Sequence, residues 1–218
     1  MSLEHFYRSY NAEKWDDALE QLKQLKPFIA DMLGNRNIMQ PDVFKNAIVA
    51  IVDQSVKEET KIDPESIFIS LGFNTDVAWF LGAIARKNCK AIVTHARSLP
   101  AWKKILEKNK TIAGIFVKYY YAYMMGFCDF ETFRVVKSNL PELKPGWDGF
   151  MNSLTNQDHS VFVWFVTTGG YPDVLVKTND QHVALVEKMK MIANRCTVAV
   201  RVKINNAIQN ALRKGLTT

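Results

Sequence analysis

Residues 179–215 read NDQHVALVEKMKMIANRCTVAVRVKINNAIQNALRKG. Apolar side chains recur in this stretch every three or four residues, which is the spacing of one face of an α-helix. The series comprises Val183, Val186, Met189, Ile192, Cys196, Val200, Ile204, Ile208 and Leu212. Asn179 or Asp180 is suited to cap the start of a helix, and Gly215 is suited to end it. We therefore predict one long helix over this stretch.

The same spacing predicts helices along most of the remaining chain. They cover residues 11–32, a helix that opens with Pro41, a long helix from Asn74 or Thr75 to His95, residues 102–109, residues 111–127, and a short helix from Asp129 to Ser138. Pro27 is expected to break or kink the first of them. Loops are expected at residues 33–37, 53–66 and 140–149. Residues 161–167 fit a strand as well as a helix, and the pattern leaves both open. The predicted fold class is all-α.

A chain of 218 residues is long enough for one large domain or two small lobes. We predict one helical lobe at residues 34–128 and a second at residues 129–218, with a basic groove between them. Residues 1–33 are expected to form a mobile N-terminal arm, because their apolar stripe needs a partner surface. The stripe comprises Trp15, Leu19, Leu22 and Leu25. The arm is expected to dock on a neighbouring copy of the chain and so build a homo-oligomer.

The net charge of +6 is concentrated in two segments. Residues 67–128 contain 9 basic and 2 acidic residues, a net charge of +7, and residues 183–218 contain 7 basic and 1 acidic, a net charge of +6. The other segments are acidic: residues 1–66 carry −4 (8 basic, 12 acidic) and residues 129–182 carry −3 (4 basic, 7 acidic). We call residues 67–128 the middle basic segment and residues 183–218 the terminal basic segment.

Two separated segments of one sign predict binding to a polyanion, because neutralised phosphates release their counterions. We select nine candidate RNA-binding residues from them: Arg86, Lys87, Lys90, Arg97, Lys103, Lys104, Arg195, Arg201 and Lys203. The alternative is that these side chains lie on solvated helix faces, the usual place for Lys and Arg. Aromatic rings beside the middle basic segment are suited to stack on bases, although core packing is the commoner role of such rings. They are Trp79, Trp102, Tyr119, Tyr120, Tyr121 and Tyr123.

The sequence contains none of the common catalytic or cofactor motifs. No GxGxxG or GxxxxGKS/T loop for a phosphate and no GxSxG nucleophile elbow is present. None of the four histidines lies at a metal-binding spacing. The three cysteines form no CxxC pair, and we expect reduced thiols in apolar surroundings. We therefore predict no catalytic residue, no metal and no cofactor in a protein that is not an enzyme; a small hydrolase is the third-ranked alternative.

The longest apolar run, residues 111–128, is interrupted by Lys118 and by four tyrosines. It is expected to be a buried core helix rather than a membrane span, which needs about 20 mostly apolar residues. The first ten residues carry Glu4, His5 and Arg8 and lack the apolar core of a signal peptide. We therefore expect an intracellular protein without a membrane span.

Residues 83–100 contain the series Ala83-Ile84-Ala85, Cys89-Lys90-Ala91-Ile92-Val93 and Leu99-Pro100. Without a gap, this series resembles the central helix of the phlebovirus-type nucleocapsid proteins, and Ala113-Gly114-Ile115 is similar to a segment beyond that helix. The resemblance implies a helical protein that holds single-stranded viral RNA in a positive cleft between two lobes and links neighbours through an N-terminal arm. Trp79 stands where the family has Arg, and residues 53–61 are mixed in charge where the family has a basic turn. Those two family contacts are not carried over.

A second resemblance lies in the terminal basic segment. Thr197-Val198-Ala199-Val200-Arg201 and Ile204-Asn205-Asn206 are similar to the RNA-lining helix of rod-shaped plant virus coat proteins, in which an Arg holds phosphate. The rest of the chain does not follow the order of that fold. This resemblance implies that Arg201 is a phosphate ligand.

These observations together predict a viral nucleocapsid protein that encapsidates single-stranded genomic RNA by sequence-independent backbone binding and self-assembly. The expected partners are single-stranded RNA and further copies of the chain, with a viral polymerase as a further candidate. The expected location is the ribonucleoprotein of the virion and the host cytoplasm. The alternative is a helical protein-interaction module, such as a viral accessory factor or adaptor, that binds no nucleic acid.

Overall fold

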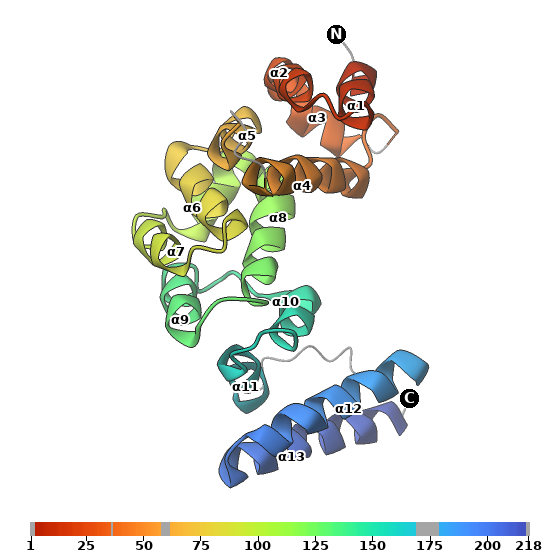
Figure 1. Cartoon of the computed structure of the whole chain (residues 1–218), viewed down its shortest axis with the longest axis vertical. Coiled ribbons are helices and arrows are strands. Elements are labelled where there is room, and N and C mark those ends of the chain that lie inside the picture. Colours follow the sequence, from red (N-terminus) through yellow and green to blue (C-terminus); the bar gives the residue numbers. More distant parts are fainter. Residues whose placement is uncertain (1–2, 36, 58–61, 169–178, 217–218) are drawn as a thin grey trace. The chain divides into compact units, whose positions relative to one another are not determined.

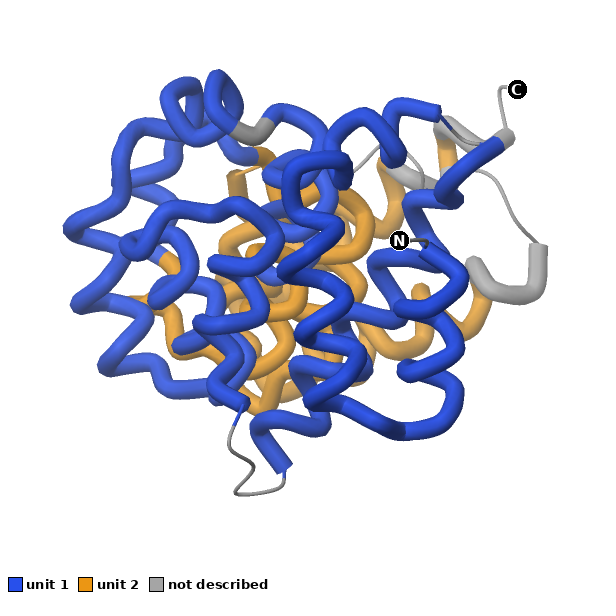
Figure 2. The backbone as a smooth tube through the Cα atoms, turned by 90° about the horizontal axis from the view of Figure 1, so that it is seen from above, with its two compact units in different colours: residues 1–120, 134–143 blue, residues 121–133, 144–218 orange. Residues whose placement is uncertain are grey.

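The computed structural model describes residues 3–35, 37–57, 62–168 and 179–216, and every regular element in these residues is a helix (Figure 1). The all-α fold class is thereby confirmed. The chain forms two compact units, which are coloured separately in Figure 2. The first unit comprises residues 1–120 and 134–143, and the second comprises residues 121–133 and 144–218. The predicted segments 1–33, 34–128 and 129–218 concern assembly as well as folding, and they stay a prediction.

The N-terminal residues form four short elements instead of the predicted helix over residues 11–32. They are α1 (Leu3–Asn11), α2 (Trp15–Leu25), the 3-10 helix η1 (Lys26–Phe28) and α3 (Ile29–Gly34). Asn11 is the last residue of α1 rather than the cap of a new helix, and Glu13 follows it with a left-handed φ of 56°. Pro27 ends the α-helical run, as predicted, because its ring removes a backbone donor.

The ring of Phe6 anchors this region in the first unit. Phe6 is fully buried, and its ring centroid lies 6.0 Å from that of Phe44 in α4 (Pro41–Lys57). The ring of Phe44 in turn meets Phe116 of α8 (Trp102–Met124) at 6.2 Å. Pro41 opens α4 as predicted. The two segments expected at residues 102–109 and 111–127 are one continuous helix, because no residue between them removes a backbone hydrogen bond.

Helix α6 (Thr75–Ala85) is the buried centre of the first unit, between α5 (Pro64–Ser70) and α7 (Cys89–Ala96). Asn74 caps α6, since its side-chain oxygen accepts from the backbone N–H of Val77 at 3.0 Å. The predicted single helix to His95 is wrong. Lys87, with a left-handed φ of 54°, ends the first helix, and the side chain of Asn88 accepts from the backbone of Ala91 to start α7.

Two asparagine side chains hold the start of the second unit together through hydrogen bonds to the backbone. The amide of Asn156 donates to the backbone oxygens of Met125 (3.0 Å) and Cys128 (2.7 Å), and that of Asn152 donates to the backbone oxygen of Ala122 (3.0 Å). These bonds tie the two asparagines to the last turn of α8 and to the residues that directly follow it. The predicted cap of α9 (Phe130–Asn139) is confirmed, because Asp129 Oδ1 accepts from the backbone N–H of Thr132 at 2.7 Å.

Two further helices complete this part of the second unit. Helix α10 (Gly146–Ser153) begins inside the loop expected at residues 140–149, and Gly146 supplies a left-handed φ of 67° at its start. Residues 161–167, left open between strand and helix, belong to α11 (Ser160–Thr167). Its buried side chains, Val161, Phe162, Phe165 and Val166, occupy one helical face.

The terminal stretch is a hairpin of two antiparallel helices, α12 (Asn179–Arg195) and α13 (Val198–Leu216), which lie side by side in Figure 1. The predicted single helix is therefore wrong. Its apolar series is shared between the two helices, and Met189, Ile192, Ile204 and Ile208 are buried. The break falls at Cys196 and Thr197, and the carbonyl of Thr197 accepts the first bond of α13 from Arg201 N–H at 2.9 Å. Thr is a favourable residue at such a helix start.

Tyr121, in the second unit, is fully buried, and its hydroxyl has no hydrogen-bond partner among the described residues. Burial raises the pKa of the Tyr121 phenol above its ordinary value of 10.0. The unfolded chain loses this proton from about pH 10 while the folded chain keeps it. Stability should therefore fall as the pH rises above about 10.

We expect Tyr121→Phe to leave the free energy of unfolding at pH 7 unchanged or to raise it by up to about 1 kcal/mol, because the orphaned hydroxyl is removed. The variant should also lose less stability than the wild type above about pH 10. Urea unfolding at pH 7 and pH 10.5 measures both effects, with Tyr10→Phe on α1 as the control. A variant less stable than the wild type by more than about 1 kcal/mol would contradict an unsatisfied hydroxyl.

Candidate nucleic-acid interface

Six of the nine candidate RNA-binding residues have exposed side chains that make no ion pair within the described residues. They are Lys90, Arg97, Lys103, Lys104, Arg195 and Lys203. The first four belong to the middle basic segment: Lys90 lies on α7, Arg97 ends α7, and Lys103 and Lys104 lie on the first turn of α8. A cation without a carboxylate partner of its own is available to a phosphate.

Arg86 has a different environment, because it neutralises a buried carboxylate. Its guanidinium donates to both oxygens of Glu65, with a distance of 2.8 Å from NH2 to Oε2, and Asp63 lies 3.8 Å away. The Glu65 side chain is only 7% exposed. The bond to Glu65 is the largest influence on the guanidinium and raises the pKa of Arg86. At Gly82 a Cβ atom would overlap the Glu65 carboxylate, so a larger residue there would force that side chain to shift away from its place beside α6.

Lys87 is held in a backbone conformation that favours glycine. Its own N–H donates to the carbonyl of Ile84 (2.9 Å), and the next N–H, of Asn88, donates to that of Ala83 (3.0 Å). This pair of bonds is the Schellman motif, whose left-handed position is usually Gly. The side chain of Lys87 is exposed, and its charge opposes the rise in the pKa of Asp53 that burial causes. A non-glycine residue at such a position indicates a side chain that is retained at a cost in stability.

Arg201 closes the hairpin turn between α12 and α13. Its Nε donates to the backbone oxygen of Ala193 at 3.3 Å, and its NH2 donates to that of Asn194 at 3.2 Å. Both carbonyls belong to the last turn of α12, which carries the negative end of the helix dipole, and that of Ala193 also accepts from the backbone N–H of Cys196 at 3.1 Å. The expected phosphate ligand of the terminal basic segment is therefore engaged with the chain's own backbone.

The aromatic residues named with the middle basic segment separate into buried and exposed rings. Tyr120, Tyr121 and Trp102 are buried, and Tyr119 and Tyr123 are half-buried. Trp79 is 48% exposed, the only large apolar side chain of α6 that is, and its ring centroid lies 5.7 Å from that of His95. Core packing thus accounts for three of the six rings, and Trp79 is the one most open to a base.

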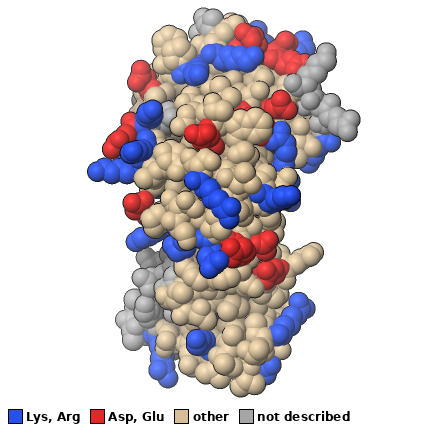
Figure 3. Space-filling view, turned by 90° about the vertical axis from the view of Figure 1, so that its left-hand side faces the viewer, with Lys and Arg blue, Asp and Glu red and all other residues tan. Residues whose placement is uncertain are grey.

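Figure 3 shows how the charged side chains are distributed on one face of the molecule. Lysine and arginine side chains lie in separate groups, and acidic side chains lie among them. This view does not show one continuous basic surface. The predicted basic groove stays a prediction.

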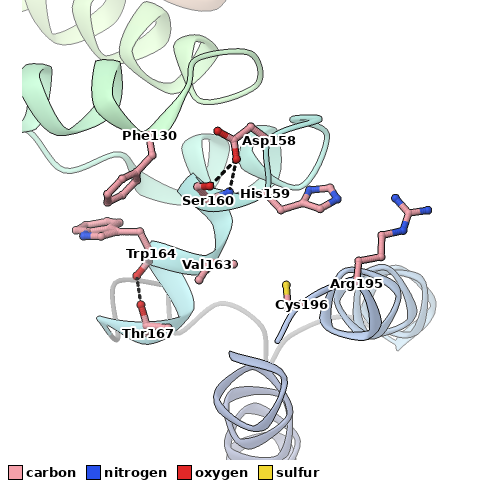
Figure 4. Close-up of a pocket in the computed structure, with 9 residues that line it drawn as sticks. All are labelled: Phe130, Asp158, His159, Ser160, Val163, Trp164, Thr167, Arg195 and Cys196. Atoms are coloured by element: carbon pink, nitrogen blue, oxygen red, sulfur yellow. Dashed lines mark hydrogen bonds between the residues drawn. The ribbon is translucent and has the colours of Figure 1, made fainter. Parts of the chain in front are cut away.

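The second unit contains a pocket of about 440 Å³ that the sequence did not predict (Figure 4). Helix α11 contributes Ser160, Val163, Trp164 and Thr167, which are spaced as one helical face opposite its buried face. Phe130 of α9 and the Arg195–Cys196 pair at the end of α12 also line it, with Asp158 and His159. The spacing of Ser160, Val163, Trp164 and Thr167 in the sequence indicates a shared face only if the segment is a helix, and the sequence left strand and helix both open.

Asp158 links the starts of the two helices that carry the aromatic wall of this pocket. Its Oδ1 accepts from the backbone N–H of Ser160 at 3.0 Å and from the Ser160 hydroxyl, and its carboxylate also accepts from the backbone of Phe130. The bond from the Ser160 hydroxyl is the largest influence and lowers the pKa of Asp158. Asp158 therefore stays charged and holds the starts of α9 and α11 against each other.

His159, the next residue, has a buried Nδ1 atom with no hydrogen-bond partner in the described part of the chain. Figure 4 shows its ring extending toward the side of the pocket on which Arg195 lies. On the opposite side, the rings of Phe130 and Trp164 point toward one another. An unsatisfied buried nitrogen costs about 1–3 kcal/mol and is a site at which a ligand can contribute a hydrogen bond.

The described ranges contain neither a cluster suited to a metal ion nor a helix suited to span a membrane. No group of three or more His, Cys, Asp or Glu side chains there is placed to hold a metal ion. Within the same residues, no helix combines the length and the apolar character needed to cross a membrane. The three cysteines form no disulfide with one another; Cys128 is buried, while Cys89 and Cys196 are partly exposed.

Comparison of the chain with protein-family models, with curated proteins and with solved structures found no significant match in any of the three.

We expect Arg86→Ala to act on stability rather than on a ligand. Removing the guanidinium leaves the buried Glu65 carboxylate without its partner, which should lower the free energy of unfolding by about 2–3 kcal/mol. Lys90→Ala, an exposed cation four residues further on, is the matched control and should change it by less than about 0.5 kcal/mol. Urea unfolding measures both. Equal stability of the two variants would mean that Glu65 does not depend on Arg86.

Lys87→Gly should move stability and RNA affinity in opposite directions. Glycine relieves the left-handed backbone and should raise the free energy of unfolding by about 0.5–1 kcal/mol. Loss of the charge should weaken binding of an oligouridylate in a fluorescence-anisotropy titration. Lys87→Ala removes the charge without relieving the backbone, so it should weaken binding without the gain in stability. Full affinity in both variants would exclude Lys87 as an RNA contact.

Proposed function

We propose that this protein binds single-stranded RNA through the phosphate backbone, without reading the sequence, as a viral nucleocapsid protein that coats its genome. The observation that carries the proposal is the set of exposed cations that make no ion pair with the carboxylates of the described ranges: Lys90, Arg97, Lys103, Lys104, Arg195 and Lys203. They come from both basic segments, and Lys87 is a further candidate held in its strained position. Arg86 and Arg201 are left out of this set, because each is engaged within the chain.

Lysine predominates among these exposed cations, which suits RNA binding that does not depend on the base sequence. Lys presents a flexible point charge, whereas the rigid fork of Arg matches one fixed geometry. Phosphate contacts position a strand without reading it. An exposed ring such as Trp79 would add stacking, which also tolerates every base.

Assembly on RNA is part of the proposal. We propose that copies of the chain associate through residues 1–33 in the ribonucleoprotein of a virion and in the host cytoplasm, where a viral polymerase would be a further partner. In the single chain the apolar stripe of this segment is turned inward: Leu19, Leu22 and Leu25 are buried. Docking on a neighbour would therefore exchange these contacts for equivalent ones on another copy.

An adaptor that binds no nucleic acid is the competing function. The exposed apolar side chains Phe28, Ile38 and Val43 of the first unit are the observation that favours it. An adaptor would leave the unpartnered cations without a role, and its affinity for RNA would be weak and insensitive to single Lys substitutions.

The salt dependence of RNA binding tests the proposal. If about four to six phosphates are neutralised, log affinity for an oligouridylate should fall against log salt with a slope of roughly −3 to −4. Lys103→Ala with Lys104→Ala should make this slope shallower by about 1.4, because each single-strand phosphate contact contributes about 0.7. Oligouridylate and oligocytidylate should show the same change, since no base is read.

The matched control is Lys14→Ala with Lys26→Ala, which removes two exposed lysines from the acidic N-terminal segment. This pair should leave the slope within about 0.3 of the wild type. Equal slopes for the two double variants would show that the middle basic segment makes no phosphate contacts. A wild-type slope near zero would exclude backbone binding altogether.

A further inference from the structure

We propose that the pocket of the second unit takes one nucleotide of the bound strand, with its base against Phe130 and Trp164 and its phosphate at Arg195. This inference rests on the proposed function, because it gives the RNA a defined base-binding subsite. Nothing in the sequence motifs indicates it. It arises from the side chains that α9, α11 and the end of α12 bring to one cavity (Figure 4).

The aromatic wall is the first part of the argument. Phe130 is 37% exposed, and Trp164 is partly exposed in a helix whose other aromatic residues, Phe162 and Phe165, are fully buried. The Trp164 ring packs edge-to-face with Phe133, with 4.9 Å between the ring centroids, and this contact restrains its position. A base that stacks on such a ring displaces water from the facing surfaces of base and ring. Because the ring is already held in place, binding does not have to order it.

The polar groups on the opposite side are the second part. Arg195 is exposed and makes no ion pair in the described residues, and it belongs to the terminal basic segment already proposed to hold phosphate. The buried Nδ1 of His159 needs a hydrogen-bond partner, which an edge of a base or a ribose hydroxyl can supply. Asp158 is the one carboxylate of the described lining, and its oxygens are occupied by donors from Ser160 and Phe130.

The size of the cavity fits a single nucleotide. A volume of about 440 Å³ lies in the lower part of the range for small-molecule sites, about 300–1,000 Å³. The ring wall lies on one side of the pocket and Arg195 on the other, which is the division that a base and its phosphate require. A lipid chain would leave both His159 and Arg195 without a partner.

Phe130→Ala tests the base contact in the full-length chain. It should weaken binding of a fluorescein-labelled oligouridylate by about five- to one-hundred-fold, the loss expected when a base–aromatic stack is removed. The slope against log salt should stay unchanged, because no phosphate contact is lost. Ile69→Ala, which removes an exposed apolar side chain of the first unit outside residues 1–33, is the control and should bind like the wild type.

An abasic strand of the same length separates a base contact from a folding defect. Wild type and Phe130→Ala should bind this strand equally, because it offers phosphates without bases. If Phe130→Ala loses affinity by the same factor for both strands, the substitution disturbs the fold of the unit, and the proposed base subsite is wrong. Trp164→Leu provides a second variant, and it should repeat the pattern of Phe130→Ala.

Photocrosslinking locates the base directly. An oligouridylate that contains 4-thiouridine should, after near-ultraviolet irradiation, attach to the peptide that contains residues 160–167 or to Phe130. Crosslinks confined to other peptides, at full RNA affinity, would overturn the subsite while leaving the proposed function intact. No RNA binding by the wild type would overturn the proposed function itself.

Discussion

The bond between Glu65 and Arg86 fixes the buried centre of the first unit. Helix α6 is buried from Phe80 to Ala85, and Gly82 leaves just enough space beside it for the Glu65 carboxylate. A buried carboxylate is tolerated only when a cation and hydrogen bonds offset the loss of water. Arg86 supplies both, from the residue that follows α6, so the helix must end where the guanidinium can reach back to α5.

The end of α6 determines which of the neighbouring cations are exposed to solvent. The Schellman bonds that stop α6 put Lys87 in a left-handed conformation, and Asn88 then starts α7 at a new angle. Lys90 and Arg97 therefore lie on a separate short helix with exposed side chains instead of continuing along a buried one. The terminal segment is organised in the same way: Arg201 satisfies the end of α12, and Arg195 and Lys203 stay exposed. In each segment one arginine is engaged within the chain, Arg86 with the Glu65 carboxylate and Arg201 with backbone carbonyls, while other basic side chains stay exposed to solvent.

The helices and the fold class could be predicted from the sequence, because apolar spacing is a local property. Their breaks at Lys87 and at Thr197 could not, since neither position carries the Gly or Pro that usually marks a helix end. The roles of Arg86 and Arg201 were hidden for a related reason. Glu65 lies 21 residues before Arg86, too far away for a local pattern to pair them. Arg201 binds backbone carbonyls, which every residue has, so the sequence does not mark them as its partners. The pocket escaped prediction because Phe130, Trp164 and Arg195 meet only after three separate helices have packed.

The central claim is that the exposed cations bind RNA of any sequence, and the absorbance of protein purified at low salt tests it most directly. The account predicts a high ratio of absorbance at 260 nm to that at 280 nm, from host RNA carried through purification, and multimers that ribonuclease treatment disrupts. High salt should strip the RNA, because backbone contacts weaken as counterions return. A protein that purifies at low salt without nucleic acid, as a discrete species that ribonuclease leaves unchanged, would contradict the account.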